Sequence, residues 1–315
     1  MKVAIVYGGT SSEREASAEN AKYIGASLEQ LGYEICMVPY EKNLVQTLKN
    51  ENTDMVYVCV QGKGHGDGTI QAILQQEGIP YTGSDAHAAA VINDKIISKM
   101  LFEKVGLQTP EWMMLTREDY EKGVFDPEAF GYPFVAKAPS EGGSFGIALI
   151  RSKEEMERIE EVFAYESPIL IERFIPGDFY TIGILQRDGK DCVLPCVQGV
   201  ELHGEKENDD PDSLKVFTGE YGVKEAKLPK ELLEQMAQMA RGAFSVTGAR
   251  DVARIDFMVD CKDNQPYILE INAVPGLKPR SLLPGAARMA GITYNDLIEG
   301  VLLAAKERTK AEEIQ

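Results

Sequence analysis

The sequence contains few cysteines and no long apolar segment. Its 315 residues include five cysteines, at positions 36, 59, 192, 196 and 261, and no two of them form a CxxC pair. We interpret them as reduced thiols that pack as small hydrophobic side chains, which is typical of a reducing compartment. No run approaches the roughly 20 apolar residues that a membrane helix needs, and the first residues do not resemble a signal peptide. These absences favour a cytoplasmic protein with no membrane partner.

Basic residues are scarce as well. The chain has 33 Lys and Arg against 50 Asp and Glu, so its formal net charge is −17. Binding nucleic acid without regard to sequence needs a basic face, so no nucleic-acid partner is expected. With 44% hydrophobic and 26% charged residues, the composition excludes a disordered chain, a collagen-like chain and a disulfide-stapled miniprotein. The length alone corresponds to about two globular domains.

Over the first 90 residues, apolar runs alternate with segments of helical periodicity. The pattern predicts strands at 3–7, 34–38 and 55–60 and helices at 16–31 and 41–49. A glycine-bearing loop follows the first strand, and a second one, residues 61–68, leads into another helix. Such alternation indicates a parallel sheet flanked by helices.

The rest of the chain predicts α+β structure with antiparallel strands. Helices are expected at 94–105, 153–164 and 229–246 and near the C-terminus. Strands are expected at 111–115, 133–138, 146–150, 168–174, 179–187, 191–200, 251–260 and 266–273. The polar stretch 203–220 has no periodicity and is either an ordinary solvated loop or an active-site lid.

The last two predicted strands carry carboxylates on one face. A turn centred on Asp263 pairs Asp256 with Glu270 and Arg254 with Asn272. Two carboxylates that face each other across a ladder repel, so we expect a cation between them, and oxygen ligands of this kind suit Mg²⁺. The alternative is a solvated polar face of the sheet. Strict alternation places the other side chains of the second strand on an apolar face: Tyr267, Leu269, Ile271 and Ala273.

Two glycine-bearing segments are candidate ligand loops. The run KAPSEGGSFG, residues 137–146, joins two strands, and its small residues let backbone N–H groups converge on an anion near Lys137. It lacks the Walker A pattern, and a plain turn is the alternative. The run GGTSSERE, residues 8–15, lies where open α/β sheets place ligands. Ser11 and Ser12 are candidate helix caps, and Ser12 with Glu15 is a candidate capping box, which leaves Glu13 without a structural role.

Together these segments resemble the D-alanine–D-alanine ligase family of the ATP-grasp superfamily. The similarity covers nearly the whole chain and is strongest in GGTSSEREAS (8–17), GDGTIQ (66–71), PYTGS (80–84), NDK (93–95), RID (254–256) and EINAVPGLKPRSLLP (270–284). The resemblance implies an open parallel α/β domain at residues 1–92, a small central domain at 93–177 and a C-terminal domain at 178–315 whose lid is at about 203–220. ATP would lie between the last two domains, and the protein would be a homodimer.

The activity implied by the resemblance is an ATP-dependent carboxylate–amine ligase. The carboxylate of one amino acid attacks the γ-phosphate of ATP, and the amine of a second then attacks the resulting acyl phosphate. The default product is D-alanyl-D-alanine for peptidoglycan synthesis. Alternatives are a related dipeptide or depsipeptide ligase, or a catalytically silent nucleotide-binding regulator. A Rossmann-type oxidoreductase is disfavoured because the dinucleotide fingerprint is missing.

The resemblance also implies roles for individual residues. The ATP contacts would be Lys95, Lys137, Glu141, Gly142, Gly143, Ser144, Glu172, Phe174, Ile175, Asp178 and Lys215. Two Mg²⁺ ions, with Mn²⁺ as a substitute, would be held by Asp256, Glu270 and Asn272. The catalytic groups and substrate contacts would be Glu13 at the first ammonium, Arg254 and Gly276 at the oxyanion, Ser281 and Leu282 at the second carboxylate, and Gln61, Lys278 and Arg280 nearby.

The sequence departs from the family pattern around the amino-acid pockets. The family's lid tyrosine is Val216 here and its partner serine is Gly143, so the Glu–Ser–Tyr link that closes the lid is absent. Gln61 stands in place of a histidine, and Phe179 in place of a ribose-binding glutamate.

Residues of the second-substrate site also differ. Positions that are small and polar in the family read Lys278-Pro279-Arg280 here. These departures predict that one or both substrates differ from D-alanine, with an acceptor that carries extra negative charge. The alternative is that Lys278 and Arg280 face solvent.

Overall fold

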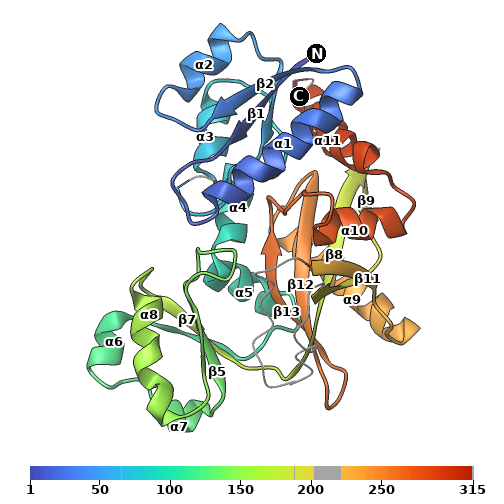
Figure 1. The fold of residues 1–315 in the computed structure, drawn as a ribbon. Coiled ribbons are helices and arrows are strands. Elements are labelled where there is room, and N and C mark those ends of the chain that lie inside the picture. The colour runs from blue at the N-terminus through green and yellow to red at the C-terminus, as the bar shows by residue number, and fades with distance from the viewer. Residues whose placement is uncertain (65, 188, 202–220, 314–315) are drawn as a thin grey trace.

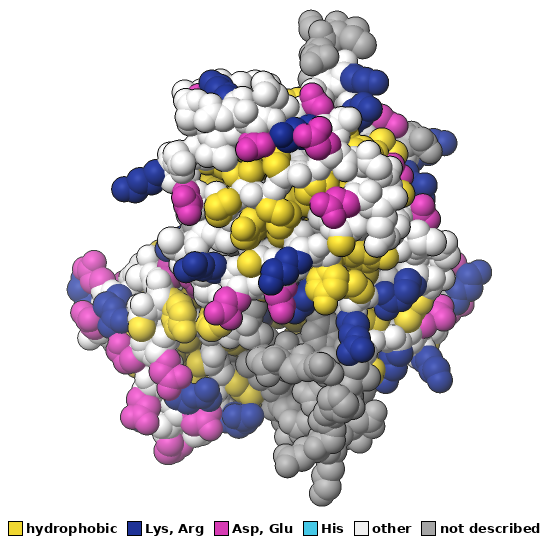
Figure 2. Space-filling view, turned by 45° about the horizontal axis from the view of Figure 1, so that its top comes forward, with side chains coloured by type: hydrophobic (Ala, Val, Ile, Leu, Met, Phe, Trp, Pro, Cys, Tyr) yellow, Lys and Arg dark blue, Asp and Glu magenta, His cyan; other side chains and the backbone are white. Residues whose placement is uncertain are grey.

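The computed structural model describes residues 1–64, 66–187, 189–201 and 221–313. The expected lid, with Lys215 and Val216, lies outside these residues. Figure 1 shows the N-terminal part above, the small central sheet at the lower left, and the C-terminal sheet with its helices at the right. In the described part of the chain, no helix is both long and apolar enough to cross a membrane. Figure 2 shows acidic and basic side chains interspersed over the visible face.

The N-terminal part is a three-stranded parallel sheet in the order β2-β1-β3. The central strand is apolar, and its residues from Val3 to Val6 have no exposed surface. A parallel bridge between Val56 and Tyr81 extends the sheet beyond β3. The expected parallel, helix-flanked sheet is therefore confirmed. Its elements are β1 (Lys2–Tyr7), α1 (Arg14–Gln30), β2 (Glu34–Pro39), α2 (Leu44–Asn50), β3 (Met55–Val58), α3 (Thr69–Gln76) and α4 (Ala86–Asn93).

The central part is a four-stranded antiparallel sheet in the order β4-β7-β5-β6. Its hydrophobic cluster includes Phe134 and Ile171 from the strands and Val162 from the covering helix. The predicted helix 153–164 is a 3₁₀ turn followed by a short α-helix. The elements are α5 (Lys95–Lys104), β4 (Trp112–Leu115), α6 (Arg117–Glu121), α7 (Pro127–Phe130), β5 (Phe134–Lys137), β6 (Ile147–Ile150), η1 (Lys153–Arg158), α8 (Ile159–Phe163) and β7 (Ile169–Arg173).

The C-terminal part is a larger sheet, in the order β11-β10-β8-β12-β13 with β9 paired to β8. The prediction of one strand at 191–200 is wrong. The chain forms two strands there because Pro195, which has no backbone N–H, lies in the segment between them. The elements are β8 (Gly177–Arg187), β9 (Lys190–Val193), β10 (Val197–Glu201), β11 (Tyr221–Glu225), α9 (Lys230–Val246), β12 (Val252–Asp260), β13 (Pro266–Asn272), α10 (Leu282–Met289) and α11 (Tyr294–Glu313).

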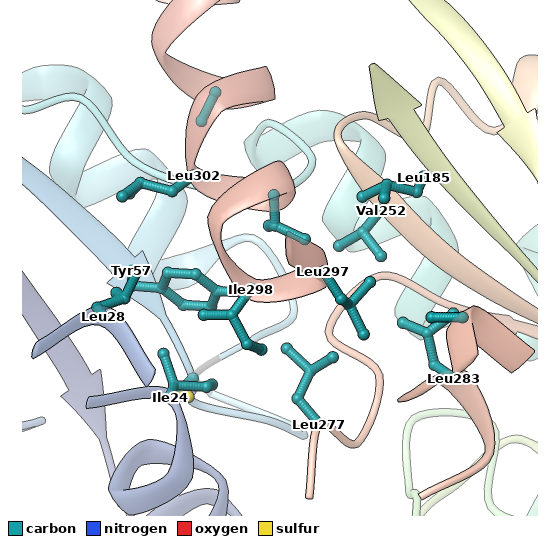
Figure 3. Packing of buried hydrophobic residues seen from close by; sticks show 14 of the residues in the cluster. Ile24, Leu28, Tyr57, Leu185, Val252, Leu277, Leu283, Leu297, Ile298 and Leu302 are labelled. Carbon is teal, nitrogen blue, oxygen red and sulfur yellow. The ribbon is translucent and has the colours of Figure 1, made fainter. Parts of the chain in front are cut away.

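The hydrophobic core joins the two ends of the chain. Ile24 of α1 and Tyr57 of β3 belong to the same buried cluster as Ile298 and Leu302 of α11 (Figure 3). A second cluster joins α4 and α5 to α9 and β12 of the large sheet. Packing thus crosses residue 92, and the domain limits at 92 and 177 remain predictions.

Strands β12 and β13 form a hairpin that carries Asp256 and Glu270, called here the acidic hairpin. It has the predicted pairing and one irregularity. Asp256 pairs with Glu270 and Arg254 with Asn272, as the sequence predicts. The register then shifts, so that Phe257 pairs with Ile268 and Leu269 is the extra residue of a β-bulge. The prediction that Leu269 lies on the apolar core face is therefore wrong, since Ile268 takes that place and is fully buried.

The predicted capping box at the start of α1 is also wrong. The helix begins at Arg14, and the N-cap residue Glu13 makes no side-chain capping bond. The Ser12 hydroxyl instead donates to Glu141 Oε2 of the central part, 2.7 Å away. A local capping role is thus replaced by a contact between distant parts of the chain.

Candidate active site

A cavity of about 400 Å³ lies between the central sheet and the C-terminal sheet. Strands β5 and β7 and the loop 138–146 form one wall, and β12 and β13 form the other. Most residues predicted from the sequence line it: Glu13, Gln61, Lys95, Lys137, Glu141, Gly142, Gly143, Ser144, Glu172, Phe174, Ile175, Arg254, Asp256, Glu270, Asn272, Gly276, Lys278, Ser281 and Leu282. Asp178 and Arg280 are described and do not line it. The sequence therefore predicts most of the cavity wall, while the role of each residue remains a prediction.

The acidic hairpin is the second wall of the cavity. Asp256 has only 2% of its surface exposed, and its carboxylate accepts four hydrogen bonds. Arg254 donates through Nε at 2.9 Å and Nη2 at 2.7 Å, a paired geometry that fixes the guanidinium. Thr181 Oγ1 donates at 2.6 Å, and Asn272 Nδ2 at 3.1 Å. Thr181, on β8, was not predicted from the sequence and holds Asp256 from the neighbouring strand.

Glu270 faces two parts of the chain. Its Oε2 lies 3.2 Å from Lys95 Nζ, which comes from the first turn of α5, and its Oε1 lies 3.4 Å from Asn272 Nδ2. Burial would raise the pKa of Glu270, but the positive charges of Lys95, Arg254 and Lys137 lower it to about 2. The carboxylate is thus ionised near neutral pH, which a metal ligand requires.

The hairpin offers only oxygen ligands to a cation. Asp256, Glu270 and Asn272 are carboxylate and amide side chains, the type that Mg²⁺ prefers over softer metals. The Asn272 amide turns Nδ2 toward both carboxylates, and a half-turn of the amide would place Oδ1 there. The donor set therefore fits a magnesium ion.

A buried chain of charges lies on the β5 and β7 side of the cavity. Glu172 is 2% exposed; one carboxylate oxygen contacts Lys137 Nζ, and the other lies 2.5 Å from Lys99 Nζ. Burial would raise the pKa of Glu172, but the two lysines hold it below its usual value. Lys99 has no exposed surface, and burial lowers its pKa. Lys99 was not predicted from the sequence, although its position four residues after Lys95 on one helix places both side chains on the same side.

An apolar strip runs along the cavity beside this charged chain. It combines Phe174 and Ile175 after β7 with Val135 of β5, Met258 of β12 and Leu269 of β13. Leu269 reaches the strip because of the β-bulge, and strict alternation would have turned it away. A flat apolar ring fits between two such walls.

Glu13 lies against the loop 138–146, called here the glycine loop. An ideal Cβ on Gly142 would lie 2.5 Å from Glu13 Oε2, so only glycine allows this approach. Burial raises the pKa of Glu13, and the positive charges of Lys95 and Arg254 oppose that shift. A half-buried carboxylate in the cavity wall suits an ammonium group.

The loop from Val274 to Ser281 also lines the cavity. Gln61 Nε2 donates to Val274 O at 2.5 Å, and Leu277 N donates to Asn20 Oδ1 at 2.8 Å. Both contacts tie this loop to the N-terminal part. Ser281 is buried and stands at the N-cap of α10, where backbone N–H groups attract an anion.

Residues 278, 280 and 178–179, at or next to departures from the family pattern, differ in their relation to the cavity. Lys278 lines the cavity, and its ammonium lies 2.9 Å from Glu19 Oε2. Arg280 is exposed. Asp178 is exposed on β8, and its neighbour Phe179 lines the cavity instead.

Comparisons with known proteins agree with this architecture. Residues 101–303 match the family model described as "D-ala D-ala ligase C-terminus". The D-alanine–D-alanine ligase of Carboxydothermus hydrogenoformans is 32% identical over 98% of this chain and 99% of its own length, and that of Desulforudis audaxviator is 33% identical over 98% and 99%.

Solved structures give the same result. The crystal structure of the D-alanine–D-alanine ligase of Bacillus anthracis complexed with ATP has a TM-score of 0.82, 29% identity and 99% coverage of both chains. The enzyme of Coxiella burnetii, at 21% identity, covers 99% of this chain and 96% of its own and shares the fold with a TM-score of 0.84. The fold is thus ATP-grasp, and the chain belongs to the D-alanine–D-alanine ligase family.

Proposed function

We propose that this protein is an ATP-dependent ligase that joins two molecules of D-alanine for peptidoglycan synthesis. One observation carries the proposal. A single cavity brings together the lysines, the acidic hairpin, and the pair Glu13 and Arg254, in a chain whose full-length relatives are named D-alanine–D-alanine ligases. A catalytically silent regulator would have no physical need for so many opposed charges in one place.

ATP would lie with its base on the apolar strip and its phosphates toward the glycine loop. Lys137 and Lys95 stand along that path, at the end of β5 and the start of α5. Both ammonium groups are largely buried, which strengthens their attraction for phosphate oxygens. The backbone of residues 141–144 would supply N–H donors, as glycine-rich phosphate loops do.

The charge of the cavity supports magnesium as a companion of ATP. The described lining residues include five cationic and five carboxylate side chains, so the protein alone does not balance a triphosphate. Asp256, Glu270 and Asn272 would hold Mg²⁺, in one or two ions, with Mn²⁺ as a possible substitute. When bound, the metal neutralises negative charge on the phosphoryl group that is transferred.

In the first half-reaction, Glu13 would bind the ammonium of the donor D-alanine. A carboxylate oxygen of the donor attacks the γ-phosphorus, the bond from phosphorus to the ADP oxygen breaks, and an acyl phosphate and ADP result. The protein contributes position and charge rather than a nucleophile.

In the second half-reaction, the amine of the acceptor attacks the acyl carbon. The C–N bond forms, the amine gives up a proton to solvent, and phosphate leaves with the electrons of the C–O bond. Arg254 and the backbone N–H of Gly276 would stabilise the oxyanion. Ser281, Leu282 and the N-terminus of α10 would bind the acceptor carboxylate.

A small donor fits the space beside Glu13. A recess of about 60 Å³, lined by Glu13, Gln61 and Ala89 among others, adjoins the main cavity, which favours a small donor side chain over a bulky one. A second candidate is a ligase for an acceptor with an additional negative charge, because Lys278 lines the cavity. The pairing of Lys278 with Glu19 weakens that alternative.

Phosphate release with ATP and Mg²⁺ across D- and L-amino acids and hydroxy acids tests the proposal. We expect turnover with D-alanine alone and none with L-alanine. Turnover only with an acidic acceptor would favour the second candidate. ATP binding without phosphate release from any pair would contradict ligase activity.

We further propose that the protein is a cytoplasmic homodimer. All five cysteines are free thiols, and Cys192 and Cys261 are exposed, which suits a reducing compartment. Exposed apolar side chains on α1 and on β2, an edge strand, include Tyr23 and Met37. Light scattering should give twice the chain mass, and Met37→Glu should shift it toward the monomer.

A further inference from the structure

The glycine loop of the cavity is anchored by Glu166, a residue outside the cavity. Glu166 Oε2 accepts a hydrogen bond from the backbone N–H of Ser140 at 2.9 Å. Glu166 Oε1 accepts one from Lys63 Nζ, also at 2.9 Å. Lys63 belongs to the second glycine-rich loop of the N-terminal part, so one carboxylate joins two distant loops.

The neighbouring residue of the glycine loop is held from the same side. Glu141 Oε2 accepts from the Ser12 hydroxyl at 2.7 Å, and its backbone oxygen accepts from Lys95 Nζ at 2.6 Å. Residues 140 and 141 are thus fixed by the N-terminal part and the first turn of α5. This segment has no helix or strand of its own, so its position depends on such contacts.

We propose that Lys63 and Glu166 are positioning residues that hold the phosphate-binding loop against the N-terminal part. Lys63 fixes and neutralises the Glu166 carboxylate, and Glu166 in turn fixes the Ser140 amide. This pair supplies an anchor in a chain that lacks the Glu–Ser–Tyr link, since Gly143 and Val216 replace its serine and tyrosine. The inference rests on the proposed function, because it takes residues 140–144 as the loop that binds ATP phosphates.

The burial of Glu166 separates this pair from an ordinary surface ion pair. An exposed pair contributes little to stability because water and salt screen it. The Lys63 side chain is 54% exposed, but that of Glu166 is only 14% exposed. Removal of this mostly buried carboxylate takes a hydrogen-bond acceptor away from both the Ser140 N–H and the Lys63 ammonium.

Four variants and a matched control test the pair. Glu166→Ala removes both contacts, Glu166→Gln keeps an acceptor for the Ser140 amide, and Lys63→Met removes only the ammonium. The fourth variant combines Lys63→Met with Glu166→Ala. Lys49→Met is the control, because Lys49 forms a comparable surface pair with Glu77, at 2.6 Å, and neither residue lines the cavity. The readouts are KM for ATP, kcat, and amide hydrogen exchange of peptides that cover residues 138–146.

We expect Glu166→Ala to raise KM for ATP about tenfold, with kcat within about twofold, and to speed exchange in the loop. Lys63→Met should raise KM about threefold, and the double variant should equal Glu166→Ala, because Lys63 acts through Glu166. Glu166→Gln should keep exchange close to that of the wild type.

Three outcomes would each overturn the proposal. The first is that Glu166→Ala keeps the KM and the exchange rate of the wild type, and the second is that the Lys49→Met control has equal effects. The third is that the effects of the single variants multiply in the double variant. Failure of the proposed function is distinguishable, since the wild type would then not turn over D-alanine while loop exchange still reports the anchor.

Discussion

At the scale of single residues, four hydrogen bonds define the surroundings of Asp256. Its two oxygens accept from Arg254, Thr181 and Asn272, so the carboxylate orients the guanidinium and offers a charge to a cation. We expect Asp256→Asn to lower kcat by about 100-fold or more and to raise the Mg²⁺ concentration needed for half-maximal rate. The measurement is phosphate release over a Mg²⁺ titration.

The matched control for this variant is Asp260→Asn. Asp260 ends the same strand, and its side chain accepts from the Lys262 backbone N–H at 2.8 Å, away from the cavity. Both changes remove one carboxylate charge from β12. An unchanged Mg²⁺ dependence in Asp256→Asn would refute the metal site on the hairpin.

The lowered pKa of Glu172 implies that the free energy of unfolding depends on pH. Its pKa in the folded chain lies below the ordinary value of 4.5, because the pull of Lys137 and Lys99 outweighs burial. Its ionised form therefore stabilises the fold above that value, and this contribution is lost as the pH falls through the folded pKa. Urea unfolding between pH 7 and pH 3 should show a steeper loss in the wild type than in Glu172→Gln, by up to about 1.4 kcal/mol per pH unit. Parallel curves would contradict the buried ion network.

At the scale of elements, the sequence predicts periodic structure well and irregular structure poorly. The pairing of Asp256 with Glu270 follows from strand alternation and one turn position. The bulge at Leu269 could not be predicted in this way. Leu269 lies between the apolar residues Ile268 and Ile271, so the sequence does not show which residue is the extra one. The role of Ser12 was missed for a similar reason, since its partner Glu141 is 129 positions away in the chain.

The glycine loop yields a prediction at the same scale. A Cβ on Gly142 would lie 2.5 Å from Glu13 Oε2, the mobile end of a side chain, so Gly142→Ala should displace Glu13 and leave the fold intact. We expect KM for the donor amino acid to rise about tenfold, with the free energy of unfolding within about 1 kcal/mol of the wild type. D-alanine titrations and urea unfolding measure the two quantities.

Gly300→Ala is a suitable companion for this experiment. Gly300 lies in α11, where an added Cβ would meet Leu185 at 3.4 Å, an ordinary contact distance. It should leave donor KM unchanged. If Gly142→Ala also leaves donor KM unchanged, Glu13 does not bind the donor.

At the scale of the whole molecule, the two ends of the chain share a core that composition and periodicity do not reveal. The spacing of apolar residues in α1 and α11 shows that each helix has a buried face. It does not show whether the two helices pack against each other or against other elements. The buried cluster around Tyr57, Ile298 and Leu302 shows that they face each other (Figure 3). The N-terminal sheet and the acidic hairpin are therefore parts of one packed body, which keeps Glu13 and Arg254 at the same cavity.

A polar contact reinforces this body at Arg308 of α11. Its guanidinium donates to Asp251 Oδ1 and Oδ2, at 3.3 and 3.1 Å, and to the backbone oxygen of Tyr81 at 2.9 Å. Asp251, just before β12, is 1% exposed and also accepts from Gly83 N at 2.7 Å. Arg308 thus joins the C-terminal helix, the edge of the N-terminal sheet and the strand that carries Arg254 and Asp256.

Removal of this guanidinium should cost stability in a way that depends on pH. Burial raises the pKa of Asp251, and Arg308 opposes that rise, so Arg308→Met leaves a buried carboxylate with less compensation. We expect a loss of about 3 kcal/mol in the free energy of unfolding at pH 8. Because the pKa of Asp251 rises further in the variant, protonation relieves the penalty, and the loss should be smaller at pH 5. The double variant Asp251→Asn with Arg308→Met should lose less unfolding free energy than the sum of the two single variants. Additive losses that do not vary with pH would show that Arg308 stabilises the molecule through packing alone.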